Sequence, residues 1–416
     1  MAVTLPRGTD VHEKARYDVG GVLLERPFKI RRLGHFGFNV TRVDEAVHFY
    51  TDLLGFMISD ELDFGGRLPP EMQDKVGPTR GYFTRHGTDH HSFVLFPRGP
   101  LEHMGMGGGQ VTINQITWQV GSLREVGDAV DYFAAQEVRV GRVGRDTPGS
   151  NWHAYPVDPD GHTNELYYGI EQVGWEGHSK PRAMYNRGFR ERPPLPQISE
   201  FDEVENAIGA GIDLNSGARF VERNPRTFDV DGILLARPFK IVRIGPVRVF
   251  VQDIERSIDY YARVLGLTPT LELDYAGHRC VFLRAGTEHH SLALYPLALR
   301  DQLGLSAHTT CLSFGLQLAN YRQLKDAVAF LHERGVTIRE LPPELSPGID
   351  YSALAIDPDG HALQLYYYMQ QVGPDGRPWS GALPSNGWAA SIASWPATVD
   401  SRPDTFAGEA FLGPWG

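Results

Sequence analysis

The sequence predicts an α+β protein built from four β-α-β-β-β modules that pair into two domains. The first observation behind this prediction is a repeat: "YDVGGVLLERPFKI" at 17–30 matches "FDVDGILLARPFKI" at 228–241. The second is that "GTDHHS" at 87–92 and "DPDGH" at 158–162 return later, in the same order, as "GTEHHS" and "DPDGH". Colinear matches over about 150 residues indicate a duplicated domain. The third observation is that each copy divides again into two similar quarters.

The first quarter reads as a strand, a helix and further strands. "FGFNV" alternates in the manner of a half-buried strand. The following segment, 41–56, places Ala46, Tyr50 and Leu54 on one helical face. Gly55 is suited to end this helix. Further strands follow and finish with "SFVLF".

The second quarter repeats this plan. "INQITWQV" reads as a strand, and 122–136 reads as a helix that begins with Ser122 and Glu125 at the spacing of a capping box. "HAYPV" and "NELYYG" read as strands joined by the turn "DPDG". Since the second copy has the same pattern, the chain holds four such modules.

These patterns set the expected domain boundaries. We expect a first domain at 1–170 and a second at 228–370. The intervening segment, 171–227, is rich in Pro, Arg, Asn and Gly, which is typical of a linker or wrapping loop. The tail at 371–416 has the same character.

Composition narrows the class of protein. The 416 residues carry a net charge of −11, which disfavours a nucleic-acid-binding surface. Two cysteines provide no disulfide framework, and no apolar stretch is long enough to span a bilayer. We see no signal peptide and therefore expect a cytoplasmic enzyme without nucleic-acid or membrane partners. We also expect a homo-oligomer.

The modules resemble the vicinal oxygen chelate superfamily, and more closely its two-domain type I extradiol ring-cleavage dioxygenases. The resemblance rests on "GHFGFNV", the "HHS" strand, "SLREVGDAVDYF" and "DPDGHTNELYY". It covers about 300 residues and implies that each module pair curls into an open barrel around one metal ion.

The resemblance also implies where the metal ligands lie. In the family, two histidines and a glutamate hold the ion, an arrangement typical of non-haem iron. The matching positions in the first half are His35, Gln115 and Glu165. Those in the second half are Pro246, Cys311 and Gln364, which do not form a metal site. We therefore expect Fe(II), or else Mn(II) or another divalent ion, in the first half alone.

Gln115 stands where the family has its second histidine. A glutamine amide is a neutral donor and binds metal in glyoxalase I of the same superfamily, but it is a weaker ligand than imidazole. The alternative is that the ligand has been lost from a decaying site.

Three further residues match catalytic positions of the family. His91 matches the acid–base histidine, and His90 should point the other way because strand side chains alternate. Tyr155 matches a tyrosine that hydrogen-bonds the substrate. Asp146 stands where the family has another histidine, and either recognises a substrate amine or lies in a surface loop. Trp152 and His153 are further candidates for the pocket wall.

The function implied by the resemblance is cleavage of an aromatic diol, or of a related enolisable ring, with O2 as co-substrate. Two alternatives remain open. A glyoxalase-type lyase or isomerase needs a carboxylate in the last strand of the first module, where this chain has Val94. The other alternative is a non-catalytic binding protein. Such a protein would have no reason to keep His35, His91, Tyr155 and Glu165 in one half and to lose nearly all of their counterparts in the other.

Overall fold

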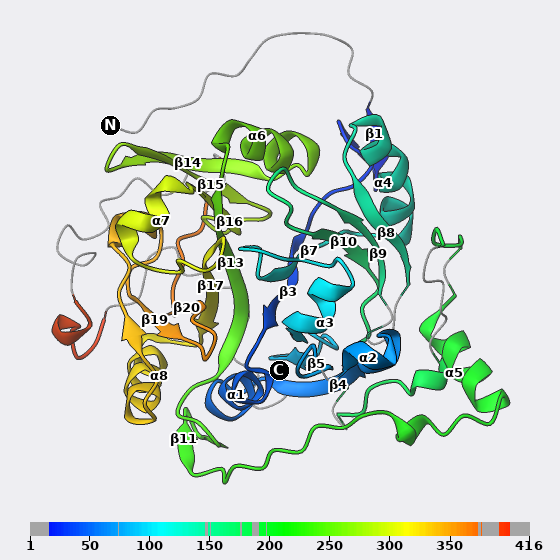
Figure 1. Cartoon of the computed structure of the whole chain (residues 1–416), viewed down its shortest axis with the longest axis horizontal. Coiled ribbons are helices and arrows are strands. Elements are labelled where there is room, and N and C mark those ends of the chain that lie inside the picture. The colour runs from blue at the N-terminus through cyan, green and yellow to red at the C-terminus, as the bar shows by residue number, and fades with distance from the viewer. Residues whose placement is uncertain are drawn as a thin grey trace.

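Two curled eight-stranded sheets stand side by side in this computed structural model, one from each half of the chain (Figure 1). The structure describes residues 16–73, 75–145, 149, 151–174, 177–184, 191–196, 198–372, 376 and 391–399. The predicted α+β class and the four modules are confirmed. Among the described residues, no helix is both long and apolar enough to cross a bilayer.

The first sheet has the order β4-β5-β6-β3-β7-β10-β9-β8. Its strands are β3 (Arg32–Val40), β4 (Met57–Asp63), β5 (Arg80–Arg85), β6 (Phe93–Pro97), β7 (Ile113–Gln119), β8 (Val140–Arg145), β9 (Trp152–Pro156) and β10 (Asn164–Tyr168). Each module contributes four neighbouring strands, and the antiparallel pair β3–β7 joins the two modules. The first strands of both modules therefore lie at the centre of the sheet.

The second sheet has the matching order β14-β15-β16-β13-β17-β20-β19-β18. Its strands are β13 (Ile241–Val251), β14 (Thr268–Tyr275), β15 (His278–Arg284), β16 (Leu292–Pro296), β17 (Cys311–Leu318), β18 (Ile338–Arg339), β19 (Ser352–Ile356) and β20 (Ala362–Tyr366). Each half is preceded by a short hairpin, β1 (Tyr17–Val19) with β2 (Val22–Leu24), and β11 (Phe228–Val230) with β12 (Ile233–Leu235).

Helices follow the first strand of every module and cover the sheets. The α-helices are α1 (Val43–His48), α2 (Pro70–Gln73), α3 (Arg98–His103), α4 (Leu123–Ala135), α5 (Glu200–Gly209), α6 (Ile254–Ile258), α7 (Ala298–Leu303) and α8 (Tyr321–Glu333). Helices α1 and α6 continue as π-helical turns, η1 (Phe49–Leu53) and η5 (Asp259–Val264). Short 3-10 turns lie at η2 (Gly65–Arg67), η3 (Arg182–Met184), η4 (Leu214–Ser216), η6 (Pro343–Leu345) and η7 (Ile392–Ser394).

Helix ends follow the local sequence signals. The Ser122 hydroxyl accepts a hydrogen bond from the backbone N–H of Glu125 and caps α4, as the capping-box spacing predicts. Gly55 has φ of +88°, a left-handed conformation that favours glycine, and the chain turns there into β4. The segment at 171–227 contains α5, which its composition did not predict, and then runs along one edge of the molecule to β11 (Figure 1).

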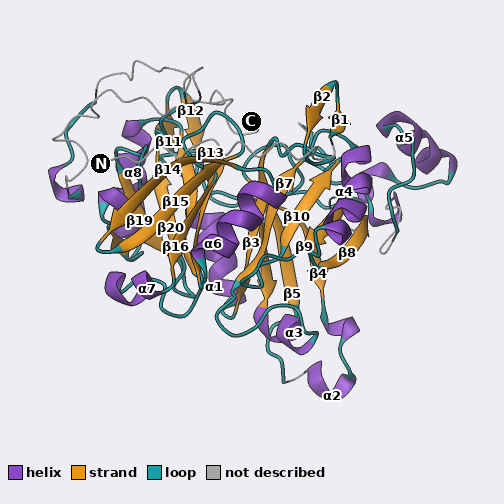
Figure 2. Cartoon of the chain, turned by 90° about the horizontal axis from the view of Figure 1, so that it is seen from above, coloured by secondary structure: helices purple, strands orange, loops and turns teal. Residues whose placement is uncertain are grey.

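The two halves share one hydrophobic core. Phe36 of β3 stacks on Phe314 of β17 with ring centroids 4.2 Å apart, and Phe38 stacks on His361 at 3.9 Å. Helices α1 and α6 lie between the two sheets (Figure 2). The halves therefore pack through their central strands and their first helices.

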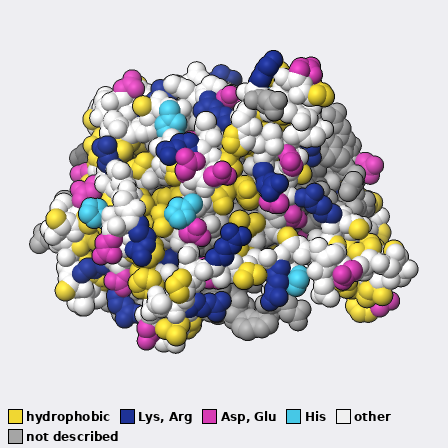
Figure 3. Space-filling model, turned by 60° about the horizontal axis from the view of Figure 1, so that its bottom comes forward, with side chains coloured by type: hydrophobic (Ala, Val, Ile, Leu, Met, Phe, Trp, Pro, Cys, Tyr) yellow, Lys and Arg dark blue, Asp and Glu magenta, His cyan; other side chains and the backbone are white. Residues whose placement is uncertain are grey.

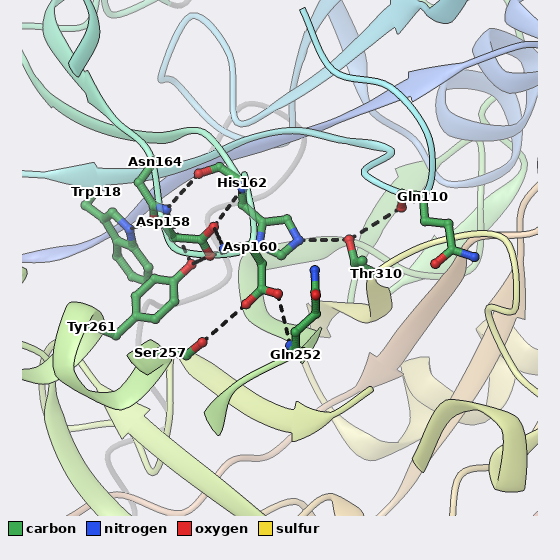
Figure 4. Close-up of polar contacts among 10 residues, drawn as sticks. All are labelled: Gln110, Trp118, Asp158, Asp160, His162, Asn164, Gln252, Ser257, Tyr261 and Thr310. Atoms are coloured by element: carbon green, nitrogen blue, oxygen red, sulfur yellow. Dashed lines mark hydrogen bonds and ion pairs between the residues drawn. The ribbon is translucent and has the colours of Figure 1, made fainter. Parts of the chain in front are cut away.

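The repeated turn "DPDGH" fastens each half to the other. In the first half, Asp158 accepts hydrogen bonds from the ring of His162 and from the Tyr261 hydroxyl of the other half, both over 2.8 Å. The other ring nitrogen of His162 lies 2.8 Å from the Thr310 hydroxyl (Figure 4). In the second half, Asp357, His361, Tyr50 and Thr112 repeat these contacts. We call these two sets of contacts the reciprocal turns.

Candidate functional site

Three neighbouring strands at the centre of the first sheet bring His35, Thr117 and Glu165 side by side. His35 lies opposite Thr117 in the β3–β7 pair, and Thr117 lies beside Glu165 in the β7–β10 pair. The Nε2 atom of His35 is 2.9 Å from Oε2 of Glu165, and the Thr117 hydroxyl donates to the same oxygen over 3.4 Å. All three side chains are buried. Two of the predicted metal ligands, His35 and Glu165, are therefore in direct contact.

The second oxygen of Glu165 has its own neighbours. The Asn151 amide donates to Oε1 over 2.7 Å, and Nδ1 of His153 lies 3.6 Å from the same atom. Burial by itself would raise the pKa of the Glu165 carboxyl, but the charge and hydrogen bond of His35 outweigh it, and the pKa lies below its ordinary value. Glu165 is therefore an anion surrounded by donors, which is the state that a metal ligand needs.

His153 is the least satisfied polar side chain at this site. It is 1% exposed, and neither ring nitrogen has a hydrogen-bond partner within the described part of the chain. Burial lowers its pKa to about 3, so the ring is neutral. A neutral imidazole beside a carboxylate is a candidate metal donor.

Strand alternation predicted that the side chains of His90 and His91 point to opposite faces. In the structure they do not. His90 and His91 lie before β6 begins, in irregular backbone, and their Nδ1 atoms are 3.1 Å apart. The ring centroid of His91 is 4.3 Å from that of His35, so His91 does reach the site. Burial, reinforced by His35 and His90, holds the pKa of His91 well below its ordinary value. The ring is therefore neutral in the site as it stands.

Tyr155 joins the site through His153. Both lie on β9 two residues apart and so share a face, and their ring centroids are 4.6 Å apart. Arg142 of β8 lies over the Tyr155 ring, with Cζ 4.7 Å from the centroid. Trp152 is next to His153 in the strand and faces the other way. Asp146 lies outside the described residues.

Gln115 lies on the same face of β7 as Thr117 but two cross-strand pairs further along. It is opposite Gly37 rather than His35. Two residues along a strand correspond to about 7 Å of backbone, a distance that a glutamine side chain partly bridges. The structure therefore places Gln115 beside the His35–Glu165 pair without joining it to them.

The residues present fit a divalent ion in part. Metal bonds to nitrogen and oxygen are about 2.0–2.2 Å long, so two neighbouring ligands at a right angle lie about 3 Å apart. The 2.9 Å between His35 Nε2 and Glu165 Oε2 matches this separation. Among the described residues, no three His, Cys, Asp or Glu side chains are already arranged to hold a metal ion. A third protein donor must therefore be an amide, such as that of Gln115, or a side chain that moves, such as His153.

The second half has different chemistry at the same strand positions. Gln364 takes the place of Glu165 beside Gly315, and its amide donates to Ser352 and Ser346 over 2.9 and 3.0 Å. The sequence assigned Cys311 as the counterpart of Gln115, and the strand register corrects this assignment to Ser313. Ser313 precedes Gly315 by two residues, as Gln115 precedes Thr117, so the assignment from the sequence was two residues off.

Three residues of the first site were not predicted. Thr117 and Asn151 hydrogen-bond Glu165, and Arg142 covers Tyr155. Strand alternation offered a partial signal, because residues two apart from Tyr155 and His153 must share their face. Arg142 gave no such signal, since its position depends on how β8 pairs with β9.

The structure thus places a buried carboxylate and neighbouring histidines at the centre of one sheet of a duplicated β-α-β-β-β scaffold. The family model for the "Glyoxalase/Bleomycin resistance protein/Dioxygenase superfamily" matches residues 32–166 and 243–365. The chain belongs to this superfamily. The first matched region coincides with the first sheet, and the second matched region coincides with the second sheet.

The chain is also similar to individual proteins. The chain is 30% identical to a 3-methylcatechol 2,3-dioxygenase of Pseudomonas putida over 162 residues, which cover 36% of this chain and 50% of that protein. The chain thus spans about half the length of this relative. Its fold resembles homoprotocatechuate 2,3-dioxygenase of Brevibacterium fuscum, with a TM-score of 0.54, 15% identity and coverage of 87% and 88% of the two chains. It also resembles a Mn(II)-bound glyoxalase of Novosphingobium aromaticivorans, with a TM-score of 0.51, 13% identity and coverage of 84% and 85%.

Proposed function

We propose that this chain is a metal-dependent dioxygenase that uses O2 to open an aromatic diol or a related enolisable ring, with its site in the first half. The observation that carries the proposal is the contact between His35 and Glu165 with His91 beside them. The named catechol-type relatives support the same reaction class. We propose Fe(II) as the ion, with Mn(II) as the second choice.

His35 and Glu165 would hold the ion, and Gln115 would supply the third protein donor. The bound ion would lower the pKa of the substrate hydroxyls and offer adjacent positions to the diol and O2. Thr117 and Asn151 orient the Glu165 carboxylate by hydrogen bonds, which is how outer partners fix a metal ligand.

The other side chains of the site would handle protons and substrate charge. His91 would accept a proton from a substrate hydroxyl, because its ring lies next to His35. The Tyr155 hydroxyl would donate a hydrogen bond to the substrate oxygen that carries the developing charge. Arg142, which lies over Tyr155, adds a positive charge that favours an anionic diolate.

The glyoxalase-type alternative lacks one of its required groups. That reaction needs a carboxylate in the last strand of the first module, and Val94 of β6 stands there, fully buried and opposite Gly37. A non-catalytic binding protein remains the second alternative.

Oxygen uptake tests the proposal directly. Protein purified without O2 would be analysed for metal and then mixed with a panel of catechols and related diols. We expect close to one iron per chain and substrate-dependent uptake of O2 with a ring-opened product. Bound metal without O2 uptake would instead favour the lyase, and a diol that binds without metal or turnover would favour the binding protein.

A further inference from the structure

An arginine lies fully buried inside the second half. The Arg248 side chain of β13 is 0% exposed, and it shares a face of the strand with Phe250, two residues further along. Phe250 and Phe282 pack against the Tyr295 ring, with centroids 6.4 and 5.9 Å away from it. These three rings belong to a buried apolar cluster. Arg248 therefore introduces a positive charge beside apolar side chains.

Two of the three guanidinium nitrogens of Arg248 have no partner. Its Nε and Nη1 atoms are buried and make no hydrogen bond within the described part of the chain. Its Nη2 atom donates to Nε2 of His290 over 3.1 Å. Burial holds the pKa of His290 well below its ordinary value, so this ring is neutral. Because a guanidinium keeps its proton in proteins, the arginine remains charged.

The groups nearest the guanidinium carry no negative charge. Burial lowers the pKa of Arg248, and Tyr295, Tyr366 and Cys311 oppose this effect. Burial raises the pKa of all three of these groups, so they are neutral near pH 7. On the surface, by contrast, charges of both signs are interspersed, as Figure 3 shows for one face of the molecule. A buried charge that lacks a counter-charge is costly.

A further unpartnered group lies directly opposite the arginine. Ser313 of β17 is the cross-strand partner of Arg248 in the β13–β17 pair, so the two side chains share a face of the sheet. The Ser313 hydroxyl is buried and has no hydrogen-bond partner in the described chain. Since buried polar groups are normally hydrogen-bonded, the hydroxyl and the guanidinium together offer donors to one missing acceptor.

The first half has no such pair of groups. Arg248 lies opposite Ser313 where, in the first half, Gly37 lies opposite Gln115. The two sheets have the same strand order, so the common fold does not require a cation at this position. The buried charge is therefore particular to the second half, and its cost to folding calls for a compensating interaction.

We propose that the interior of the second half binds one small monovalent anion, a halide or the carboxylate of a short acid, between Arg248 and Ser313. Hydrogen bonds from a guanidinium to an anion are stronger than those between neutral groups. One guanidinium balances one negative charge, and the Ser313 hydroxyl adds a neutral donor. This inference concerns the second half and is independent of the dioxygenase proposal.

The dependence of stability on the anion tests this proposal. Unfolding of the full chain by urea would be measured while sodium chloride or sodium formate replaces sodium gluconate, a larger anion, at constant ionic strength. An anion that binds only the folded chain shifts the unfolding equilibrium by mass action. We expect each tenfold rise in anion concentration above its Kd to lower the unfolding constant of wild type about tenfold relative to that of Arg248→Met. A larger effect of chloride would identify a halide site, and a larger effect of formate would identify a carboxylate site.

A matched control separates binding from general salt effects. Arg256 is an exposed arginine of the same half, and Arg256→Met should respond to both anions as wild type does. An equal response of wild type and Arg248→Met would overturn the proposal.

A second measurement decides the question even if Arg248→Met does not fold. Crystals of the wild-type chain would be soaked separately in bromide and in formate. We expect an anomalous peak of bromide, or density for formate, beside Nε or Nη1 of Arg248 and the Ser313 hydroxyl. Neither anion at this place, or a water molecule there in both soaks, would overturn the proposal.

Discussion

The two halves of the molecule have the same strands in the same order, but their central strands carry opposite charges. The first half buries an anion, Glu165, beside the buried side chains of His35 and His153. The second half buries a cation, Arg248, whose guanidinium donates to His290 over 3.1 Å. Gln364, the counterpart of Glu165, is uncharged. The comparison shows that the same scaffold accommodates a buried carboxylate in one half and a buried guanidinium in the other.

A change of packing accompanies this change of charge. In the first half, Gly37 lies opposite Val94, and a Cβ atom on Gly37 would come within 2.1 Å of Val94 Cγ2. In the second half, Arg248 lies opposite Ala293 at the same pair of positions. A small residue therefore faces a larger one in both halves, but the larger residue is on a different strand. The second half thus contains a long side chain at a position that is a glycine in the first.

Removal of the carboxylate should have the largest effect. Glu165→Ala should lose the bound ion and all turnover, because it removes the charged ligand. Gln364→Ala should leave both unchanged. Metal analysis by mass spectrometry after anaerobic purification checks this, and two ions per wild-type chain would mean that both halves are metal sites.

The paired histidines give the next test. His91→Asn should lower turnover by about two to four orders of magnitude, the range for a positioned acid–base group, while the metal remains bound. His290 occupies the position of His91 in the repeated GTEHHS motif of the second half, and His290→Asn should leave turnover close to wild type. Steady-state O2 uptake measures both variants. Equal losses of turnover at the two positions would show that the active half has been assigned incorrectly.

The reciprocal turns are where the halves do not differ, and they should respond alike. Asp158→Ala and Asp357→Ala should each lower the free energy of unfolding by about 3 kcal/mol, because each leaves a buried histidine and tyrosine without their partner. Urea denaturation measures both variants. A large cost for one turn and none for the other would show that the two contacts are not equivalent.

The identity of the third donor is a finer distinction. If Gln115 binds the ion, Gln115→Ala should weaken metal affinity by about 10–100-fold, whereas His153→Ala should have a smaller effect. A larger loss of metal affinity in His153→Ala than in Gln115→Ala would indicate that His153 is the third donor. Gln115→His should tighten iron by restoring the family's usual ligand set. Anaerobic titration of iron into the metal-free proteins separates these outcomes.

The smallest expected effect is a pH dependence of stability. Burial lowers the pKa of His162. The charge and hydrogen bond of Asp158 together raise this pKa by more than burial lowers it, so the folded pKa lies above the ordinary value of 6.5. A group with a raised folded pKa stabilises the fold fully below its unfolded pKa, and this contribution is lost as pH rises through the folded pKa. Wild type and His162→Gln would be denatured at pH values below the unfolded pKa and above the folded pKa. The free energy of unfolding should decline less with rising pH in the variant.

The sequence predicted most of the architecture and only part of the site. Strand alternation and helical periodicity are local, so the modules and the capped helix at Ser122 could be read directly. The placement of His35 opposite Thr117 depends on strand register, which a bulge next to His35 shifts without a local signal. His90 and His91 were assigned opposite faces because the start of the strand was placed too early. Asn151 and Arg142 contact the site only because β8, β9 and β10 pair, and no pattern within one strand indicates that.

The reciprocal turns link the evolutionary fates of the two halves. Tyr261 and Thr310 belong to the second half, yet they complete the buried hydrogen bonds of Asp158 and His162 in the first half. A random substitution at either position would therefore emerge from a genetic screen as a defect in the reaction that we propose for the first half. For the same reason, two separately expressed halves should each remain insoluble and should recover a native form only when they are produced together. Selection must therefore preserve the surface of the second half that contacts the first half. The residues at the centre of the second half are free to change.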